Sequence, residues 1–421
     1  MRRGMKMALM LGALVVLVGG YALVNQMENA QEVGETEGVF PLWAEGSDVT
    51  SLSWEKDGAE YAFQKGEDGW TREGDASFPV NQTVLESLAE RIANLTATRE
   101  LTDVSERSDY GLSDASFAVT AKDADGGAVT FAVGAQTPFE DGYYISASNS
   151  DALYVVESSL ESAFDLTLTE LAQMESIPQA ETVTRLTVGS LDIAYDGESG
   201  TWSDAATGEK LDASAAEKLA SAANDLGWNE LIAVSASDEE LAEWQLDEEQ
   251  ATALMIYDGE EAVLSLLLGG EDESGNRYAR LADSRMVYTL FSSDVSSLLS
   301  ASIDTLWNKA LETITAEELG TAVFTWEDGE LTLTADDAES ATAQGILEQL
   351  GALEGASRVE LGELGQSVLT VRMTDADGEE TTVACYAYSV DAYLVPITAT
   401  HGMLVDAGEV DKLIRMLKQV G

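Results

Sequence analysis

Apolar and polar residues alternate in three separate stretches of the chain, and each stretch begins in the same way. In the first, alternating residues run from Val49 to Trp54, turn at Asp57-Gly58, and return through Tyr61 and Phe63. Period-two alternation around a short polar turn is typical of a β-hairpin. We therefore expect three hairpins, which open at residues 49–54, 183–188 and 322–326.

Each hairpin is followed by a segment with apolar residues spaced three and four apart. In the first copy, Asn81 can cap a helix whose apolar face carries Leu85, Leu88 and Ile92. This spacing predicts a helix with one buried stripe. The cap is Asp212 or Ser214 in the second copy and Ser340 or Thr342 in the third.

A set of strands comes next in each copy. It follows Tyr110-Gly111-Leu112 in the first copy and Trp244-Gln245-Leu246 in the second. Asp-Gly turns recur at 125–126, 258–259 and 377–378, and short closing helices are expected at 158–164, 292–299 and 408–417. The predicted unit is ββ(β)α followed by about four strands and a helix, and the optional strand carries Trp70 or Trp202.

These patterns predict an α+β protein in which three repeated units of mainly antiparallel sheet, each with a covering helix, follow an N-terminal transmembrane helix. The expected segments are a basic tip and anchor at 1–26, an acidic tether at 27–48, and units at 49–175, 176–312 and 313–421. Within the tether, residues 39–43 are apolar and are a candidate first strand of the ectodomain.

The expected anchor is the uncharged apolar run at residues 7–24, which is long enough to cross a bilayer. Arg2, Arg3 and Lys6 precede it, and no Lys or Arg then occurs before Lys56. Basic residues stay on the cytoplasmic side, so a single-pass protein with a cytoplasmic N-terminus and an extracytoplasmic C-terminal region is expected. A cleaved signal peptide is the alternative.

Charge narrows the set of partners. The 421 residues include 77 acidic and 22 basic side chains, a formal net charge of −55. Such a surface repels nucleic-acid phosphates, so no nucleic-acid partner is expected. A protein partner in the cell envelope is expected, whereas divalent cations would bind only weakly, if at all. The acids also keep the protein soluble.

Candidate catalytic chemistry is sparse. The single histidine, His401, cannot form a His-rich zinc site, and the single cysteine, Cys385, cannot form an internal disulfide. Adjacent strands could bring the two together as a nucleophile pair, but we favour Cys385 as a small sheet residue and His401 in a hairpin loop. No catalytic, cofactor-binding or metal-binding residue is predicted, and the protein is not expected to be an enzyme.

Two acidic turns resemble the start of a calcium-binding loop. They are Asp123-Ala124-Asp125-Gly126 and Asp375-Ala376-Asp377-Gly378, and residues 271–273 form a further acidic run. An EF-hand also needs a later glutamate and flanking helices, whereas strands are expected here. We interpret both segments as type I′ turns.

Other side chains leave two alternatives open. Tyrosines at 143, 144, 386, 388 and 393 could stack on sugars, or they could be half-buried sheet residues. Paired carboxylates could hydrolyse glycosides, although acids are too numerous for any pair to stand out.

The segment Leu52–Gly58, the pair Gly69-Trp70 and the turn Tyr110-Gly111-Leu112 resemble a family of bacterial membrane-anchored proteins known as domain of unknown function 4340. The resemblance covers about residues 1–165 well and later copies less well. It implies an extracytoplasmic envelope protein, and some relatives accompany ABC-type transport systems of the gliding-motility class. It implies no catalytic residues.

We therefore expect a membrane-anchored, extracytoplasmic, non-enzymatic protein whose repeats bind another protein, with an accessory role in an ABC-type transport complex as its most specific form. The alternatives are a cell-wall or glycan-binding module and, less favoured, a carboxylate-based hydrolase.

Overall fold

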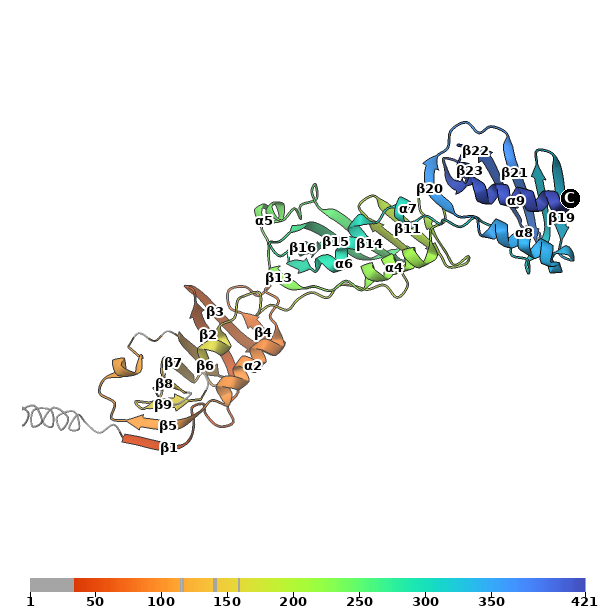
Figure 1. Ribbon diagram of the computed structural model, residues 1–421. Helices are drawn as coiled ribbons and strands as arrows, with labels where there is room; N and C mark the ends of the chain where they lie inside the picture. The colour runs from red at the N-terminus through yellow and green to blue at the C-terminus, as the bar shows by residue number, and fades with distance from the viewer. Residues whose placement is uncertain (1–33, 114, 116, 139–141, 158–159, 421) are drawn as a thin grey trace, which may run out of the picture. The chain divides into compact units, whose positions relative to one another are not determined.

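The computed structural model describes residues 34–113, 115, 117–138, 142–157 and 160–420 (Figure 1). The expected membrane anchor at residues 7–24 lies outside these residues. Within the described part of the chain, no helix has both the length and the apolar character needed to cross a membrane.

Three sheets, all built from antiparallel pairs, make up the described chain, which confirms the α+β class. The first sheet has nine strands in the order β1-β5-β9-β8-β7-β6-β2-β3-β4. The strands are β1 (Gly34–Pro41), β2 (Val49–Lys56), β3 (Ala59–Gly66), β4 (Gly69–Arg72), β5 (Thr96–Thr102), β6 (Phe117–Asp123), β7 (Ala128–Gln136), β8 (Tyr143–Ala147) and β9 (Leu153–Val156). Its helices are α2 (Gln82–Ala93), the 3₁₀ turn η1 (Arg107–Tyr110) and α3 (Leu160–Phe164).

The second sheet has eight strands in the order β12-β11-β10-β14-β15-β16-β17-β13. They are β10 (Arg185–Val188), β11 (Leu191–Asp196), β12 (Thr201–Asp204), β13 (Glu230–Ala233), β14 (Thr252–Asp258), β15 (Glu261–Glu271), β16 (Arg277–Leu281) and β17 (Val287–Leu290). Its helices are α4 (Ala213–Asn224), α5 (Asp238–Glu243), α6 (Ser292–Ser300) and α7 (Ile303–Leu306).

The third sheet has seven strands in the order β19-β18-β21-β22-β23-β24-β20. They are β18 (Leu319–Trp326), β19 (Gly329–Thr334), β20 (Gly355–Glu360), β21 (Ser367–Asp375), β22 (Glu380–Ala387), β23 (Ala392–Pro396) and β24 (His401–Asp406). Its helices are η2 (Asp337–Glu339), α8 (Ala341–Gly351) and α9 (Ala407–Val420). The sheet has no counterpart of the short strands β4 and β12 among its described residues.

All three sheets share one strand order. The opening hairpin lies at one edge, the four later strands follow as a meander, and the strand after the helix returns to pair beside the last of them. That returning strand is β5, β13 or β20. The sequence predicted about four strands after each helix, whereas the structure has five, because this short returning strand has too few buried positions to produce a clear alternation.

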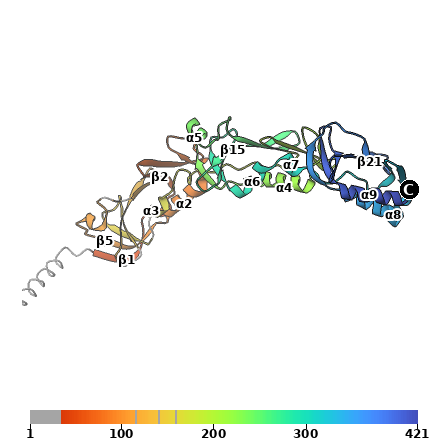
Figure 2. The same ribbon diagram turned by 45° about the horizontal axis from the view of Figure 1, so that its top comes forward.

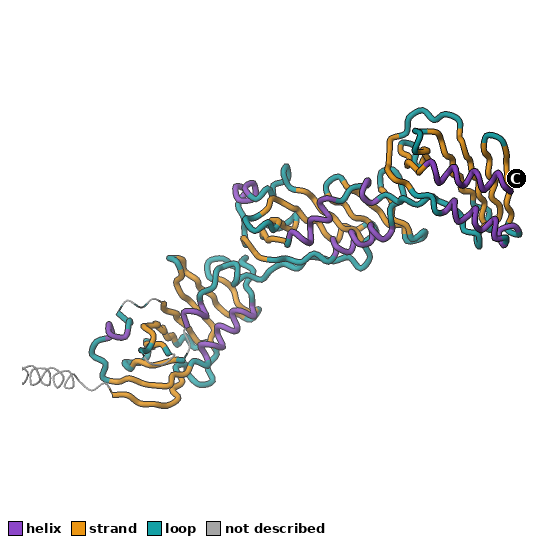
Figure 3. The backbone as a smooth tube through the Cα atoms, viewed as in Figure 1, coloured by secondary structure: helices purple, strands orange, loops and turns teal. Residues whose placement is uncertain are grey.

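The longer helices cover one face of each sheet, whereas Leu241 of the short helix α5 packs against Leu267 and Tyr278 on the opposite face of the second sheet. In the second sheet α4 and α6 lie together on one side, and in the third α8 and α9 do the same (Figures 2 and 3). The helices α2, α4 and α8 begin at caps that the sequence predicted: the side chains of Asn81, Asp212 and Ser340 accept hydrogen bonds from backbone amides in the first turn. The core of each unit lies between these helices and the sheet.

The predicted tether at 27–48 needs correction. Residues 34–41 form β1, which pairs with β5, and Arg99 of β5 forms a 2.6 Å ion pair with Glu35. Hydrogen bonds between main-chain groups hold this edge strand, so most of its side chains remain exposed and its sequence looks like a tether. Leu42 and Trp43, which follow it, are buried.

The turn type predicted for the two acidic segments is also wrong. A type I′ turn needs positive φ at both central residues, as at Asp57 (52°) and Gly58 (79°). In the acidic turns only the glycines, Gly126 (85°) and Gly378 (91°), have positive φ. This fits a type I turn closed by a glycine bulge.

Residue contacts divide the chain into two compact units. The first ends at Glu175 and contains the nine-stranded sheet, and the second begins at Ser176 and contains the other two sheets.

Candidate functional site

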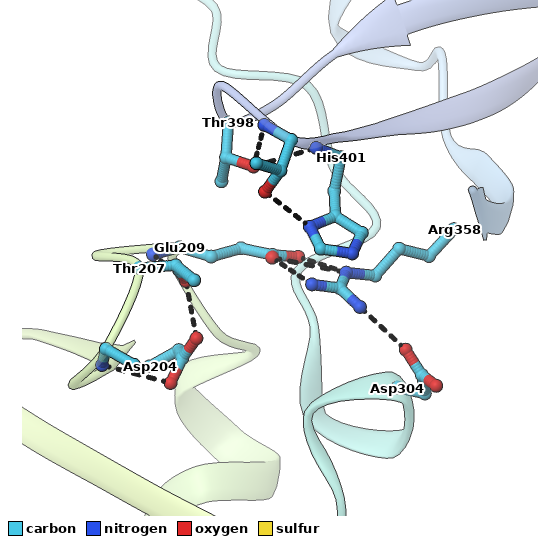
Figure 4. A network of polar contacts seen from close by, with 9 residues as sticks. Asp204, Thr207, Glu209, Asp304, Arg358, Thr398 and His401 are labelled. Atoms are coloured by element: carbon cyan, nitrogen blue, oxygen red, sulfur yellow. Dashed lines mark hydrogen bonds and ion pairs between the residues drawn. The ribbon is translucent and has the colours of Figure 1, made fainter. Parts of the chain in front are cut away.

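A buried ion pair joins the second and third sheets within the second compact unit. Glu209 lies in the loop between β12 and α4, and Arg358 lies on β20 (Figure 4). Arg358 donates from Nε to Glu209 Oε1 at 2.8 Å and from Nη2 to Glu209 Oε2 at 2.6 Å. Its Nη1 donates to Asp304 Oδ1 at 2.9 Å.

The loop that carries Glu209 is itself fixed by hydrogen bonds. Thr207 Oγ1 donates to Asp204 Oδ2, and Asp204 N donates to Glu209 O at 2.9 Å. Gly208, with φ of 73°, supplies the left-handed residue that this tight loop requires. These contacts fix the backbone of the loop that carries Glu209.

The Glu209–Arg358 ion pair is almost completely buried. The Glu209 side chain is 3% exposed and that of Arg358 13%, so both charges have lost most of their water. Such charges are tolerated only when their hydrogen bonds are satisfied by a partner. The hydrogen bonds to Glu209 raise the pKa of Arg358, so the guanidinium stays charged. The arrangement is suited to fixing two sheets together rather than to proton transfer.

A cavity of about 310 Å³ lies beside the pair. Its lining is mixed and includes the apolar residues Leu311 and Val395 and the ion-paired residues Lys210 and Glu312. It is formed by the loop between β12 and α4, the segment 308–312 and strands β22, β23 and β24 of the third sheet, and Glu209 forms part of its wall.

The comparisons with known proteins bear on the repeat. A family profile described as Domain of unknown function (DUF4340) matches twice, over residues 70–232 and 202–360, which together cover more than half of the chain. This chain belongs to that family. The two matches begin at equivalent tryptophans, Trp70 on β4 and Trp202 on β12, and end in or at the equivalent returning strands β13 and β20.

The DUF4340 matches therefore begin and end at equivalent places in the structural repeat, and the family membership that the sequence motifs indicated is confirmed. No curated protein and no solved structure matches the chain.

In this DUF4340 chain the single cysteine, Cys385, and the single histidine, His401, lie on different strands. Cys385 is fully buried on β22, and His401 opens β24, with β23 between these two strands. Burial raises the pKa of the Cys385 thiol to about 12, so it stays protonated at neutral pH.

His401 was expected in a hairpin loop, but it is the first residue of a strand. Its Nδ1 is 2.9 Å from Thr400 Oγ1, and its backbone amide donates to Thr398 Oγ1 at 3.0 Å. The ring points toward the Glu209–Arg358 pair (Figure 4). His401 therefore lies beside the buried pair, and β23 separates its strand from that of Cys385.

The acidic turns use their carboxylates internally. Asp123 accepts a hydrogen bond from the amide of Gly127 at 2.7 Å, and Asp375 accepts from Asp377 and Glu379 at 2.9 Å each. Across the described ranges, no group of three or more His, Cys, Asp or Glu side chains is arranged to hold a metal ion.

The tyrosines have varied environments. Tyr144 makes an edge contact with Tyr110 at 4.8 Å between ring centroids, and Tyr393 donates to Asp411 at 2.9 Å. Tyr143 and Tyr386 are half-buried, and Tyr388 is 55% exposed. Most of these rings thus contribute to their own unit, and the sugar-stacking alternative stays a prediction.

Sequence reasoning did not find Glu209, Asp304 or Arg358. The available signal was the scarcity of bases: an arginine on a strand of a chain with 77 acids and 22 bases is a candidate for a specific pair. The identity of its carboxylate could not be predicted, because Glu209 and Arg358 are 149 residues apart in the sequence.

Proposed function

We propose that this DUF4340 chain is a membrane-anchored, extracytoplasmic, non-enzymatic protein whose sheets bind a protein partner. The observation that carries the proposal is that α8 and α9 lie together over the core face of the third sheet, while the opposite face carries exposed polar side chains such as Thr325 and Arg372.

Strand register identifies faces of this kind in the first and third sheets. In the first sheet Leu52 and Trp54 of β2 are buried in the core, so Ser53 between them faces the other way. Its cross-strand neighbours are Ala62 and Thr120. In the third sheet Thr325 pairs with Glu330 on one side and Thr370 on the other.

Small and β-branched residues of this kind make a flat surface that another chain can cover. Their side chains lose little conformational entropy on ordering, and their hydroxyl groups can exchange hydrogen bonds with water for bonds to a partner. A repeated fold that presents such a face in its first and third sheets supports binding better than it supports a single catalytic centre.

The membrane anchor rests on the sequence. Its support is the apolar run at 7–24, the basic residues before it and the long segment without Lys or Arg after it. The expected result for a C-terminal alkaline phosphatase fusion is an active enzyme, and that for a C-terminal green fluorescent protein fusion through the same export route is a dark protein. The reverse pattern would refute the proposed orientation.

The binding surface is tested by site-specific photo-crosslinking in intact cells. A photoreactive residue at Thr325 or at Arg372 places the probe on the helix-free face of the third sheet, where both side chains are exposed. The matched control is Glu348, which is exposed on α8 on the helix-covered side.

We expect one partner of defined mass to be captured from Thr325 and Arg372 but not from Glu348. Equal capture from all three positions, or none from the sheet face, would remove the proposed surface. An accessory role in ABC-type transport, suggested by the family resemblance, further requires that the captured protein is a subunit of such a system.

A further inference from the structure

The first unit contains an internal cation site. Lys65 of β3 donates from Nζ to both carboxylate oxygens of Glu86 on α2, at 2.9 and 2.8 Å. Trp70 of β4 donates from Nε1 to the same carboxylate at 3.0 Å, and the ammonium lies 6.0 Å from the centroid of the Trp70 ring. Hydrogen bonds from Lys65 and Trp70 lower the pKa of Glu86 and keep it charged.

The second repeat, which contains the eight-stranded sheet, keeps the tryptophan and the glutamate of this site. Trp70 pairs across the hairpin with Lys65, and Trp202 pairs in the same way with Tyr195. Glu86 is five residues after the helix cap Asn81, and Glu217 is five residues after the cap Asp212. Trp202 and Glu217 are therefore the counterparts of Trp70 and Glu86.

The lysine itself is absent from the second unit. Tyr195 occupies the position of Lys65, and its ring packs on Trp202 with centroids 5.3 Å apart. Gln82, whose side chain holds the backbone of Trp70 at 2.6 and 2.9 Å, is replaced by Ala213. Both exchanges remove polar groups that fill the space between hairpin and helix in the first unit.

A pocket occupies the vacated position. It has a volume of about 400 Å³, and its walls include Tyr195, Trp202, Ala213 and Glu217. Two further acids, Glu181 and Asp225, line it, and none of its lining residues is Lys or Arg. Within the described residues, the Glu217 carboxylate and the Trp202 indole N–H have no hydrogen-bond partner or ion pair.

We propose that this pocket binds a primary alkylammonium group, which takes the place that Lys65 fills in the first unit. The ammonium donates hydrogen bonds to Glu217, and its alkyl chain packs against the Tyr195 and Trp202 rings. Glu181 and Asp225 add attraction for the positive charge. The group comes either from a free amine or from a lysine side chain of another protein.

Aromatic walls favour an alkylammonium over an inorganic cation. A hydrated metal ion gains little from Tyr195 and Trp202, whereas the methylene groups of an alkylammonium lose contact with water there. The third sheet has no described counterpart of the tryptophan strand, so the pocket is expected once among the described residues.

The test is calorimetric titration of the full-length protein with n-butylammonium, which has the four-carbon chain of lysine, and with Nα-acetyl-lysine N-methylamide. We expect a dissociation constant on the order of 10 mM for butylammonium, because Glu217 is exposed and the ligand gains one exposed ion pair and one aromatic contact. Neutral n-butanol and sodium ions should not compete at the same concentration.

Three variants test whether binding depends on the pocket itself or only on the negative charge of the whole protein. Glu217→Gln should weaken binding by about three- to fivefold, the upper part of the range for an exposed ion pair. Tyr195→Lys installs the lysine of the first unit and should abolish binding, because its own ammonium then occupies the site. The charge-matched control is Glu273→Gln, at an exposed acid in the β15–β16 hairpin, which should change the affinity by less than about twofold.

Binding of both ligands indicates that the pocket can receive a lysine of another protein, and binding of butylammonium alone indicates a free amine. The proposal is overturned if neither ligand binds. It is also overturned if Glu273→Gln weakens binding as much as Glu217→Gln, or if folded Tyr195→Lys protein binds as the unchanged protein does. Circular dichroism establishes that each variant is folded.

Discussion

Two arginines of the second compact unit make a forked contact with a carboxylate, and they differ in burial. Arg185 donates to Asp192 at 2.8 and 2.6 Å, and these side chains are 45% and 33% exposed. Arg358 donates to Glu209 at similar distances, but that pair is almost entirely enclosed. Geometry alone would rank the two pairs as equal, whereas desolvation makes the loss of one partner far more costly in the enclosed pair.

Replacement of Arg358 by Met should therefore reduce the free energy of unfolding of the third sheet by about 3 kcal/mol, because it leaves the Glu209 carboxylate buried without its partner. Arg185→Met, the matched control, should cost less than about 1 kcal/mol. Urea unfolding monitored by hydrogen exchange at β20 and β24 measures the third sheet alone. Equal losses in the two variants would show that Glu209 is reached by water.

Glu86 predicts a pH dependence of the first unit. Its folded pKa lies below the unfolded value, so its contribution is present at pH 7 and is lost as the pH falls through the folded pKa. The Glu86 side chain is 45% exposed, and solvent screening limits the contribution to less than about 1 kcal/mol.

Glu86→Gln should accordingly be less stable than the unchanged protein at pH 7, and the difference should vanish below about pH 4. Thermal unfolding of both proteins across this range measures it. Glu90→Gln removes an exposed charge from the same helix and should show no such convergence. A difference that persists unchanged at pH 3 would mean that the glutamine fails for steric reasons.

At the scale of the element, the sequence predicted the helices and the inner strands because their burial is periodic. Leu85, Leu88 and Ile92 identify α2, and Asn81 caps it as expected. The returning strands were missed because they depend on pairing with a distant strand: β20 pairs with β24, and only Gly355 of its six residues is buried. The same limit applies to the site, where Trp70 and Trp202 were noticed but Glu86 and Glu217 were not linked to them.

Two equivalent turns each pack against a glycine on a strand that follows later in the chain. The turns at Tyr110-Gly111-Leu112 and Trp244-Gln245-Leu246 pack against Gly134 of β7 and Gly269 of β15. A Cβ atom at Gly134 would lie 2.2 Å from Tyr110 O, and one at Gly269 would lie 2.3 Å from Trp244 O. Backbone oxygens held in a turn cannot move away easily, so the strand requires glycine here.

Gly269→Ala should thus destabilise the second sheet by about 2 kcal/mol or more, through overpacking against the turn. The control is Gly197→Ala, because no atom lies within 4 Å of that added Cβ and the backbone is not left-handed. Calorimetric unfolding of the full-length protein provides the comparison. If Gly269→Ala were as stable as Gly197→Ala, the turn would have to be free to move.

At the scale of the whole molecule, one fold is used three times with different polar groups inserted. The corner between the tryptophan-bearing strand and the helix that follows it contains Lys65 in the first repeat and an open acidic pocket in the second. The third repeat has no such strand among its described residues. Because the family profile begins at this corner in both of its matches, the corner belongs to the shared fold, and its side chains are what differ between copies.

The net charge of −55 predicts how the whole molecule responds to salt. With 77 acids and 22 bases, most carboxylates have no basic partner, and their mutual repulsion destabilises the compact state. Raising NaCl from 0.01 to 0.15 M shortens the screening length from about 30 to about 8 Å. Thermal unfolding midpoints should rise by a few degrees, with the same rise in KCl, because screening does not depend on the identity of the cation.

The enclosed Glu209–Arg358 pair is screened little, so the free-energy cost of Arg358→Met should be similar at both salt concentrations. A midpoint that falls as salt is added would mean that surface ion pairs outweigh the repulsion, in spite of the excess of acids.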